Sequence, residues 1–409
     1  DQSKVNADFG WLLDTSINPQ DINSSNELVV TYQFATNQIS SIGFLNTNQN
    51  DAVLSYITNT NNFSNYNNLG SSKATDLIEF SEKNEINTAD GIFKDHYQLY
   101  NLISARNTEV RSRHGFASSL YRNDRPNGVS GPFPNEHSQG WIRGYSFRGK
   151  YDSESSFSSH NLDGLGTMFG IDKYFNDILV GIAVGNSSSK YRSSSTFFSD
   201  TRIINSSLYS TIGGRKKYID LALSYADAKT DCNDTFNTTS YDVNSSMESF
   251  YIGGGYSLVS PNGLQLTPEI SFLYSSYEQD NYQRSGITSK NVDAFSTTSK
   301  LLSTGINVAT EYQIDWFNLG VAMIPEFRAH WLHEINSNES DTLNYTFLNN
   351  NDTGSLSVRS RDKSLIKVGA GLNIWSWYLK NTRLEVDYDL TKSESYEEHL
   401  ISCKLGVKF

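Results

Sequence analysis

The sequence predicts an all-β protein in which about 12 antiparallel strands close into a transmembrane β-barrel, preceded by a small N-terminal region of β and helical segments. Three observations indicate this fold. The C-terminal segment alternates apolar and polar residues, strand-like segments with one apolar face recur from about residue 140, and the connections between them alternate between short and long. Aromatic residues make up 13% of the chain, which suits β-structure and membrane interfaces.

The C-terminal segment places Leu405, Val407 and Phe409 on one face and Lys404 and Gly406 on the other. The end of a soluble domain usually frays, so a two-faced strand there has little purpose. The last strand of a membrane barrel must instead pair with the first strand and present its outer face to lipid. We therefore expect this strand to close the barrel.

Four further segments alternate a large apolar face with a small or polar one, as expected for a wall between lipid and a polar lumen. They are residues 178–185, 219–226, 264–275 and 302–312. The longest uninterrupted apolar stretch, 178–184, is much shorter than the ~20 residues that a membrane-spanning helix needs. The chain therefore crosses a membrane with strands, if it crosses one.

The predicted connections follow a second regularity. Those after even-numbered strands are short, and those after odd-numbered strands are mostly long and rich in Asn, Ser, Asp and Thr. The short ones are 176–177, 213–216, 260–263, 315–316 and 378–381; the long ones are 186–200, 227–242, 279–293 and 334–357. Bacterial outer-membrane barrels have short periplasmic turns and long external loops. Aromatic residues beside the short turns, among them Phe175, Tyr218 and Trp316, predict a girdle at the periplasmic interface.

The segments before the barrel differ from it in composition. Residues 1–70 are rich in Asn and contain a β-like piece at 27–35, so they could be the last turns of a β-helix. Residues 71–138 form a helical linker, with a helix expected near 93–113, and Pro and Gly follow that helix. We place the domain boundaries at 1–70, 71–138 and 139–409.

Charge and cysteine content exclude several classes of function. The formal net charge of -12 argues against a nucleic-acid partner, which would require a basic face. The two cysteines, Cys232 and Cys403, are predicted in an external loop and on the lipid face, too far apart to form a disulfide. No cofactor motif is present in the sequence.

The candidate residues for catalysis or metal binding are few. His330 and His333 point to opposite faces of a strand, so we expect no shared metal ion. Glu326 and an inward His330 make the one local pair suited to a barrel hydrolase, and a structural polar contact explains the same pair. The sequence thus predicts no enzyme, no metal and no cofactor.

Several segments, in order, resemble the autotransporter β-domain, the translocator of type V secretion. These are the strand led by Trp141 (GWIRGYSFRGKY), GTMFGIDKYFNDILVGIAVG, LQLTPEISFLY, IPEFRAHWLHEI, IKVGAGLNI, and the final strand. The resemblance covers about 140–409 and the helix before it. At the C-terminus, Leu405, Val407 and Phe409 correspond to the family's assembly signal. That signal usually has a small residue and an aromatic residue where this chain has Lys404 and Val407.

The resemblance implies an outer-membrane anchor that exports or displays its own N-terminal passenger, with the long loops and the N-terminal region at the cell surface. Its partners would be outer-membrane lipid, the barrel-assembly machinery and the passenger. It also implies a helix that threads the lumen. Opposite charges would hold that helix in a confined space: Arg106, Arg111 and Arg113 on the helix, and Asp220, Glu269, Glu311 and Glu326 on the wall. A stand-alone pore or scaffold, or less plausibly a barrel hydrolase, is the alternative.

Overall fold

The computed structural model describes residues 13–22, 28–34 and 138–408, except 154–158, 176–177, 194–196, 214–216, 235–238, 286–288, 315–320, 336–341, 349–352, 358–361 and 377–381. The predicted helix at 93–113, with its three arginines, and Phe409 lie outside the described residues. Within the described ranges, no helix is long and apolar enough to cross a membrane.

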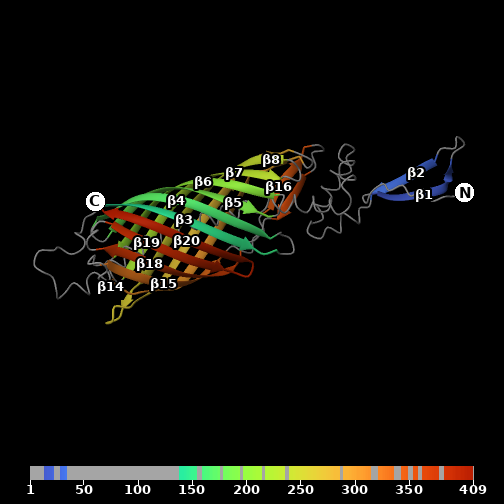
Figure 1. Ribbon diagram of the computed structural model, residues 1–409. Coiled ribbons are helices and arrows are strands. Elements are labelled where there is room, and N and C mark those ends of the chain that lie inside the picture. Colours follow the sequence, from blue (N-terminus) through green and yellow to red (C-terminus); the bar gives the residue numbers. More distant parts are fainter. Residues whose placement is uncertain are drawn as a thin grey trace, which may run out of the picture.

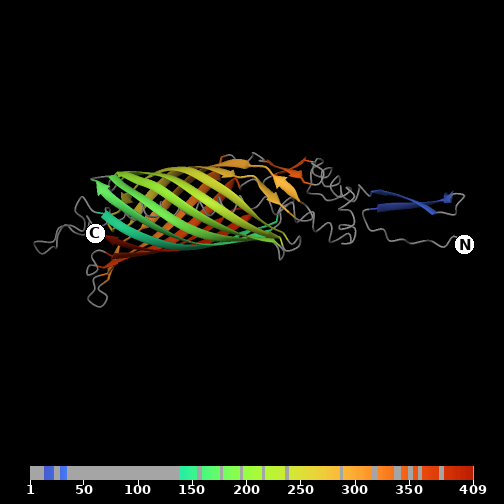
Figure 2. The same ribbon diagram turned by 90° about the horizontal axis from the view of Figure 1, so that it is seen from above.

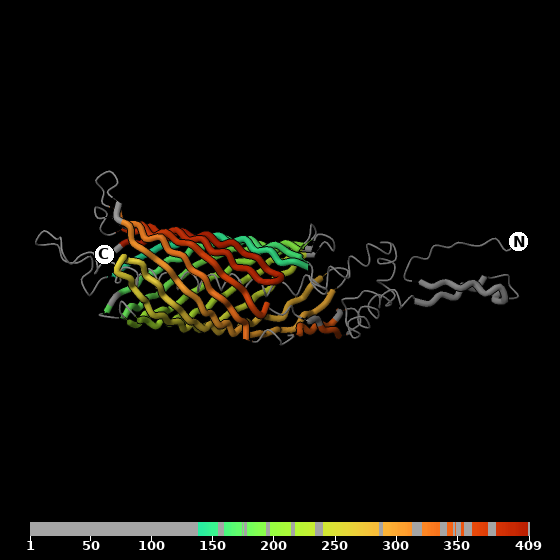
Figure 3. The backbone as a smooth tube through the Cα atoms, turned by 90° about the horizontal axis from the view of Figure 1, so that it is seen from below, coloured from blue at the N-terminus to red at the C-terminus, as the bar shows by residue number. Residues whose placement is uncertain are grey.

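Twelve antiparallel strands form a closed barrel, as predicted (Figure 1). They are β3 (Ser138–Tyr151), β4 (His160–Phe175), β5 (Ile178–Arg192), β6 (Phe197–Gly213), β7 (Lys217–Asp234), β8 (Thr239–Tyr256), β10 (Gln265–Gln279), β13 (Phe295–Ala309), β15 (Val321–Glu334), β18 (Ser364–Ser376), β19 (Thr382–Lys392) and β20 (Tyr396–Lys408). The pairing of β20 with β3 joins the last strand to the first, and the pairing of β13 with β15 completes the ring. The strands run obliquely around the wall, as Figures 2 and 3 show from opposite sides.

The two-faced pattern of the sequence sets which side chains point outward. On β5, Ile182 and Val184 are 57% and 56% exposed, whereas Leu179 and Ala183 are buried. The other predicted segments show the same alternation, with Ile219 outward and Asp220 buried on β7. A barrel in a membrane places its apolar residues outward against lipid and its polar residues inward, and this wall does so.

The two ends of the barrel differ as the connection lengths predicted. The start of β3, the end of β20 and the strand ends that flank the short connections share one end, at the label C in Figure 1. At the other end, however, much of the polar sequence that we assigned to loops is strand. β5 continues to Arg192, β7 continues to Asp234, and β8 begins at Thr239. The backbone can pair there whatever the side chains are, so Ser-, Asn- and Asp-rich segments extend the hairpins past the apolar belt.

Cys232 illustrates this correction. We placed it in an external loop, but it lies on β7 with its side chain buried. Cys403 lies on the outward face of β20, as predicted, and neither cysteine forms a disulfide.

Two of the long connections form a separate four-stranded sheet at that end. Its strands are β11 (Tyr282–Arg284), β12 (Lys290–Val292), β16 (Thr342–Phe347) and β17 (Thr353–Ser357), in that order. Tyr282 stacks on Tyr241 of β8 with ring centroids 5.2 Å apart, and the Lys290 ammonium lies 4.4 Å from the centre of the Tyr345 ring. Ring stacking thus attaches this sheet to the barrel wall.

Four further strands complete the described chain. β1 (Leu13–Ile22) and β2 (Leu28–Phe34) pair with each other, and β2 coincides with the β-like piece predicted at 27–35. β9 (Leu258–Val259) pairs with β10, and β14 (Tyr312–Ile314) pairs with β15.

Candidate functional site in the barrel lumen

The inward-facing side chains of β3 to β6 lie flat against the wall because glycines on neighbouring strands leave room for them. A Cβ atom at Gly181 would overlap the Tyr209 ring, and one at Gly170 would overlap the indole of Trp141. The Trp141 indole N–H donates to the Tyr209 hydroxyl over 2.9 Å, and that hydroxyl donates to Asp172 over 2.9 Å. Bulky residues therefore cover the wall without projecting straight across the lumen.

The wall formed by β5 to β8 is lined mainly by small and neutral residues. Hydroxyl pairs join the strands: Ser207 with Ser224 at 2.9 Å, and Thr201 with Thr230 at 3.0 Å. The buried carboxylate of Asp220 accepts a hydrogen bond from the Thr211 hydroxyl over 2.8 Å. We call β5–β8 the neutral wall.

The opposite wall, β3, β20, β19, β18 and β15, carries a continuous network of charges, and we call it the charged wall. At its centre, Arg328 of β15 contacts three carboxylates. Its Nε lies 2.8 Å from Asp389 Oδ1, and its Nη1 lies 3.1 Å from Asp387 Oδ1 and 3.4 Å from Glu326 Oε1. Lys367 of β18 adds a contact of 3.7 Å to Asp389.

A second part of this network crosses the seam where the first and last strands meet. Glu385 of β19 forms a close ion pair with Arg143 of β3, and the Lys404 ammonium of β20 lies 3.3 Å from Glu385 Oε2. All three side chains are almost fully buried. Asp387 links the two parts, since its Oδ2 lies 3.9 Å from Arg143 Nη2. Lys404, which departs from the family's terminal pattern, thus has a defined electrostatic partner.

The structure places the predicted wall carboxylates at different positions. Asp220, Glu269 and Glu326 face inward, but each contacts its own wall: Thr211 bonds Asp220, Tyr218 bonds Glu269, and Asn307 donates to Glu326 over 2.7 Å. Glu311 does not lie on a barrel strand, because β13 ends at Ala309 and Glu311 follows in the connection to β14. Their pairing with the three linker arginines stays a prediction.

The residues considered for catalysis do not form the pair that we singled out. His330 faces inward, where it fills the space above Gly305, and its Nε2 lies 3.8 Å from Glu269 Oε2 rather than beside Glu326. His333 lies on the outward face and packs against Trp331. In the part of the chain that the structure describes, no three His, Cys, Asp or Glu side chains are grouped to hold a metal ion.

One residue of the predicted aromatic girdle also differs from expectation. Tyr218, which we assigned to the interfacial girdle, is buried in the lumen, and its hydroxyl bonds Glu269.

The terminal strand agrees with expectation. Leu405 and Val407 point outward, as the terminal alternation predicts, and Val407 pairs with Gly140 of β3.

Sequence reasoning missed most of the charged wall. The missed residues are Arg143, Arg328, Lys367, Arg383, Glu385, Asp387 and Asp389. One signal could have found the acidic residues: in 383–391 every second residue is polar or charged, which is the pattern of a lumen-facing row.

Comparisons with known proteins agree with this architecture. A family model described as autotransporter beta-domain matches residues 140–389. The chain is 22% identical over 297 residues to surface cell antigen sca1 of Rickettsia conorii; the match covers 65% of this chain and 15% of that protein. The chain thus spans about 15% of the length of this curated relative.

Solved structures show the same fold. The translocator domain of autotransporter NalP from Neisseria meningitidis matches with a TM-score of 0.54 and 14% identity, over 76% of this chain and 99% of that one. The transport unit of autotransporter AIDA-I from Escherichia coli matches with a TM-score of 0.50 and 15% identity, over 74% and 98%.

Proposed function

Because this chain belongs to the autotransporter β-domain family, we propose that its barrel is the outer-membrane anchor and export conduit for a passenger at its N-terminal side. Residues 71–138 would serve as the linker, and residues 1–70 would be the end of the passenger. The proposal places the long-connection end of the barrel at the cell surface and the C-terminal end at the periplasm. Outer-membrane lipid would cover its outward face, and the barrel-assembly machinery would insert it.

The single observation that carries this proposal is the character of the lumen. The wall is closed, it is polar, and side chains such as Trp141 and Tyr209 lie flat over glycines. A polypeptide that passes through needs space and polar surroundings for its backbone, because unsatisfied backbone groups are costly away from water. Since Arg328 and Glu385 already have partners on the wall, a passing chain meets paired charges that bind it weakly.

The linker arginines have a specific place in this proposal. The charged wall carries more carboxylates than bases around Arg328, where Glu326, Asp387 and Asp389 meet. A helix that brings Arg106, Arg111 and Arg113 into the lumen would add the missing positive charge. Its ion pairs would be stronger there than in water, since the confined lumen has a lower effective dielectric constant.

Surface display of an N-terminal epitope tests the function. An epitope placed before Asp1 should become accessible to antibody and to external protease on intact cells. The matched control deletes β20, which removes the strand that closes the barrel against β3. Equal surface labelling of both proteins, or none with the intact protein, would contradict the proposal.

Two further measurements separate the alternatives. A tag between β5 and β6 should be labelled on intact cells and a tag between β6 and β7 should not, and the reverse pattern would contradict the orientation. High ion conductance by the full chain in planar bilayers would favour a pore. We also propose that the barrel has no hydrolytic activity, so hydrolysis that is lost in His330→Ala would contradict this.

A further inference from the structure

Cross-strand register aligns the outward side chains of β5, β6, β7, β8 and β10 in rows around the barrel. One row is entirely apolar or aromatic and consists of Ile182, Leu208, Leu223, Phe250 and Tyr274. The next row, one step toward the long-connection end, consists of Val184, Ser206, Tyr225, Glu248 and Ser276. The polarity of the wall therefore changes between these two rows, which is where a bilayer's apolar core gives way to headgroups.

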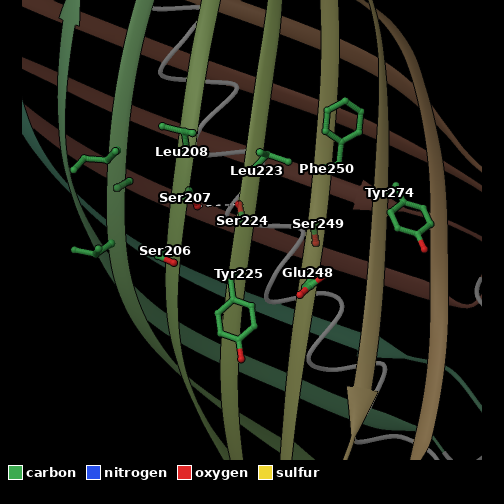
Figure 4. Close-up of a pocket in the computed structure, with 13 residues that line it drawn as sticks. Ser206, Ser207, Leu208, Leu223, Ser224, Tyr225, Glu248, Ser249, Phe250 and Tyr274 are labelled. Carbon is green, nitrogen blue, oxygen red and sulfur yellow. Dashed lines mark hydrogen bonds between the residues drawn. The ribbon is translucent and has the colours of Figure 1, made fainter.

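A groove of about 650 Å³ follows these rows, and Figure 4 draws the residues that line it and labels ten of them. Large side chains such as Leu208 and Leu223 form its apolar part, and the small Ser206 leaves space between Val184 and Tyr225. The inward residues along the groove are also small: Ala183, Ser207, Ser224 and Ser249. A groove of this volume is within the range of small-molecule sites.

A carboxylate stands at the polar edge of this groove. Glu248 is outward and exposed, and it lies directly across from Tyr225 and diagonally from Tyr274. Asp227 and Glu278 occupy the next row outward on β7 and β10. Among the described residues, none of these three carboxylates forms an ion pair. By contrast, the basic residues further out are paired: Arg202 with Asp231, and Lys229 with Asp242.

We propose that the groove binds a membrane lipid whose headgroup carries an ammonium group. One acyl chain would pack against the apolar side chains of the row from Ile182 to Phe250, and the ammonium group would sit at Glu248. The rings of Tyr225 and Tyr274 would contact the ammonium group by cation–π attraction. The unpaired negative charge at the edge of an apolar groove selects this headgroup over one without a positive charge.

The test uses the full chain, purified in detergent and delipidated. It is mixed with equal amounts of phosphatidylethanolamine and phosphatidylglycerol of identical acyl chains, and bound lipids are counted by native mass spectrometry. The two lipids share the phosphate. The headgroup of phosphatidylethanolamine carries an ammonium group, whereas that of phosphatidylglycerol carries uncharged hydroxyl groups. We expect the wild type to retain phosphatidylethanolamine about fivefold over phosphatidylglycerol, as for one exposed ion pair.

Three variants identify the groups responsible. Glu248→Gln keeps the shape of the site and should abolish the preference, and Ser206→Leu fills the groove and should reduce retention of both lipids. Asp242→Asn alters an outward carboxylate of the same strand that lies beyond the groove, so it should match the wild type. Each variant is first checked for the heat-dependent gel shift of a folded barrel. If Ser206→Leu does not fold, the comparison of Glu248→Gln with the wild type still tests the proposal.

Several results would overturn the proposal. They are equal retention of both lipids by the wild type, a preference that persists in Glu248→Gln, and occupation of the groove by a second copy of the chain, seen as a dimer that Ser206→Leu disrupts. The inference requires only an outward face in lipid, not export. A failed lipid test with normal surface display would therefore leave the proposed function intact.

Discussion

The two walls of the lumen are held together by different forces. On the neutral wall, hydroxyl pairs and rings seated on glycines join neighbouring strands. On the charged wall, buried ions join strands that are not neighbours, since Arg143 of β3 reaches Glu385 of β19 across β20. One wall thus depends on fit between side chains, whereas the other depends on ion pairs between buried charges. Because the closure seam lies on the charged wall, charge pairing stabilises the place where the chain's ends meet.

The largest expected effect concerns Arg328. Replacing it with Met keeps much of its length but leaves Glu326, Asp387 and Asp389 without their shared counter-charge. Breaking a buried ion pair by removing one partner costs about 3–5 kcal/mol, so Arg328→Met should lower the unfolding midpoint in urea far more than any change on the neutral wall. The matched control is Arg202→Gln, which removes an outward ion pair with Asp231. Similar midpoints for the two variants would show that the buried network around Arg328 stabilises the barrel no more than an outward ion pair does.

The second expected effect lies at the seam. In a double-mutant cycle, Arg143→Gln and Glu385→Gln should each destabilise the folded barrel, but the double variant should lose less than the sum. Residues in one charge network typically show coupling of about 0.5–3 kcal/mol. Lys404→Gly, which restores the small residue of the family's terminal pattern, should also lower stability because Glu385 loses a second partner. The heat-dependent gel shift compares these four variants with the wild type. Additive effects of Arg143→Gln and Glu385→Gln would show that the seam is not held by this network.

The third effect tests steric fit on the neutral wall. Gly181→Ala places a methyl group where the Tyr209 ring lies, and overpacking of this kind costs about 1–3 kcal/mol. Gly144→Ala is the matched control, since nothing lies within 4 Å of its Cβ position. We expect Gly181→Ala to unfold at a lower urea concentration than Gly144→Ala. If the two unfold alike, ring-on-glycine packing does not support this wall.

The same contrast explains how much could be predicted from the sequence. Alternation along a strand is a local property, so it predicted the strands, their outward faces and the inward position of Asp220 and Glu326. Pairing between Arg143 and Glu385 joins residues 242 positions apart, and it depends on register, which alternation does not specify. The extension of β7 to Asp234 was not predicted, because composition alone does not show where the strands of a polar hairpin stop pairing.

The smallest expected effect lies on the outward face of the barrel, at the far end of the β7–β8 hairpin. The Lys229 ammonium lies 2.7 Å from Asp242, which lowers the pKa of that carboxyl by hydrogen bonding and raises the pKa of Lys229. A lowered carboxyl pKa adds stability above the ordinary value of 3.8 and loses it as the pH falls. Both side chains are more than half exposed, so solvent and salt screen the pair. Lys229→Gln should therefore lower the unfolding midpoint only slightly at pH 7, and not measurably in high salt. A shift as large as that of Arg143→Gln would mean that exposure does not separate the two kinds of ion pair in this barrel.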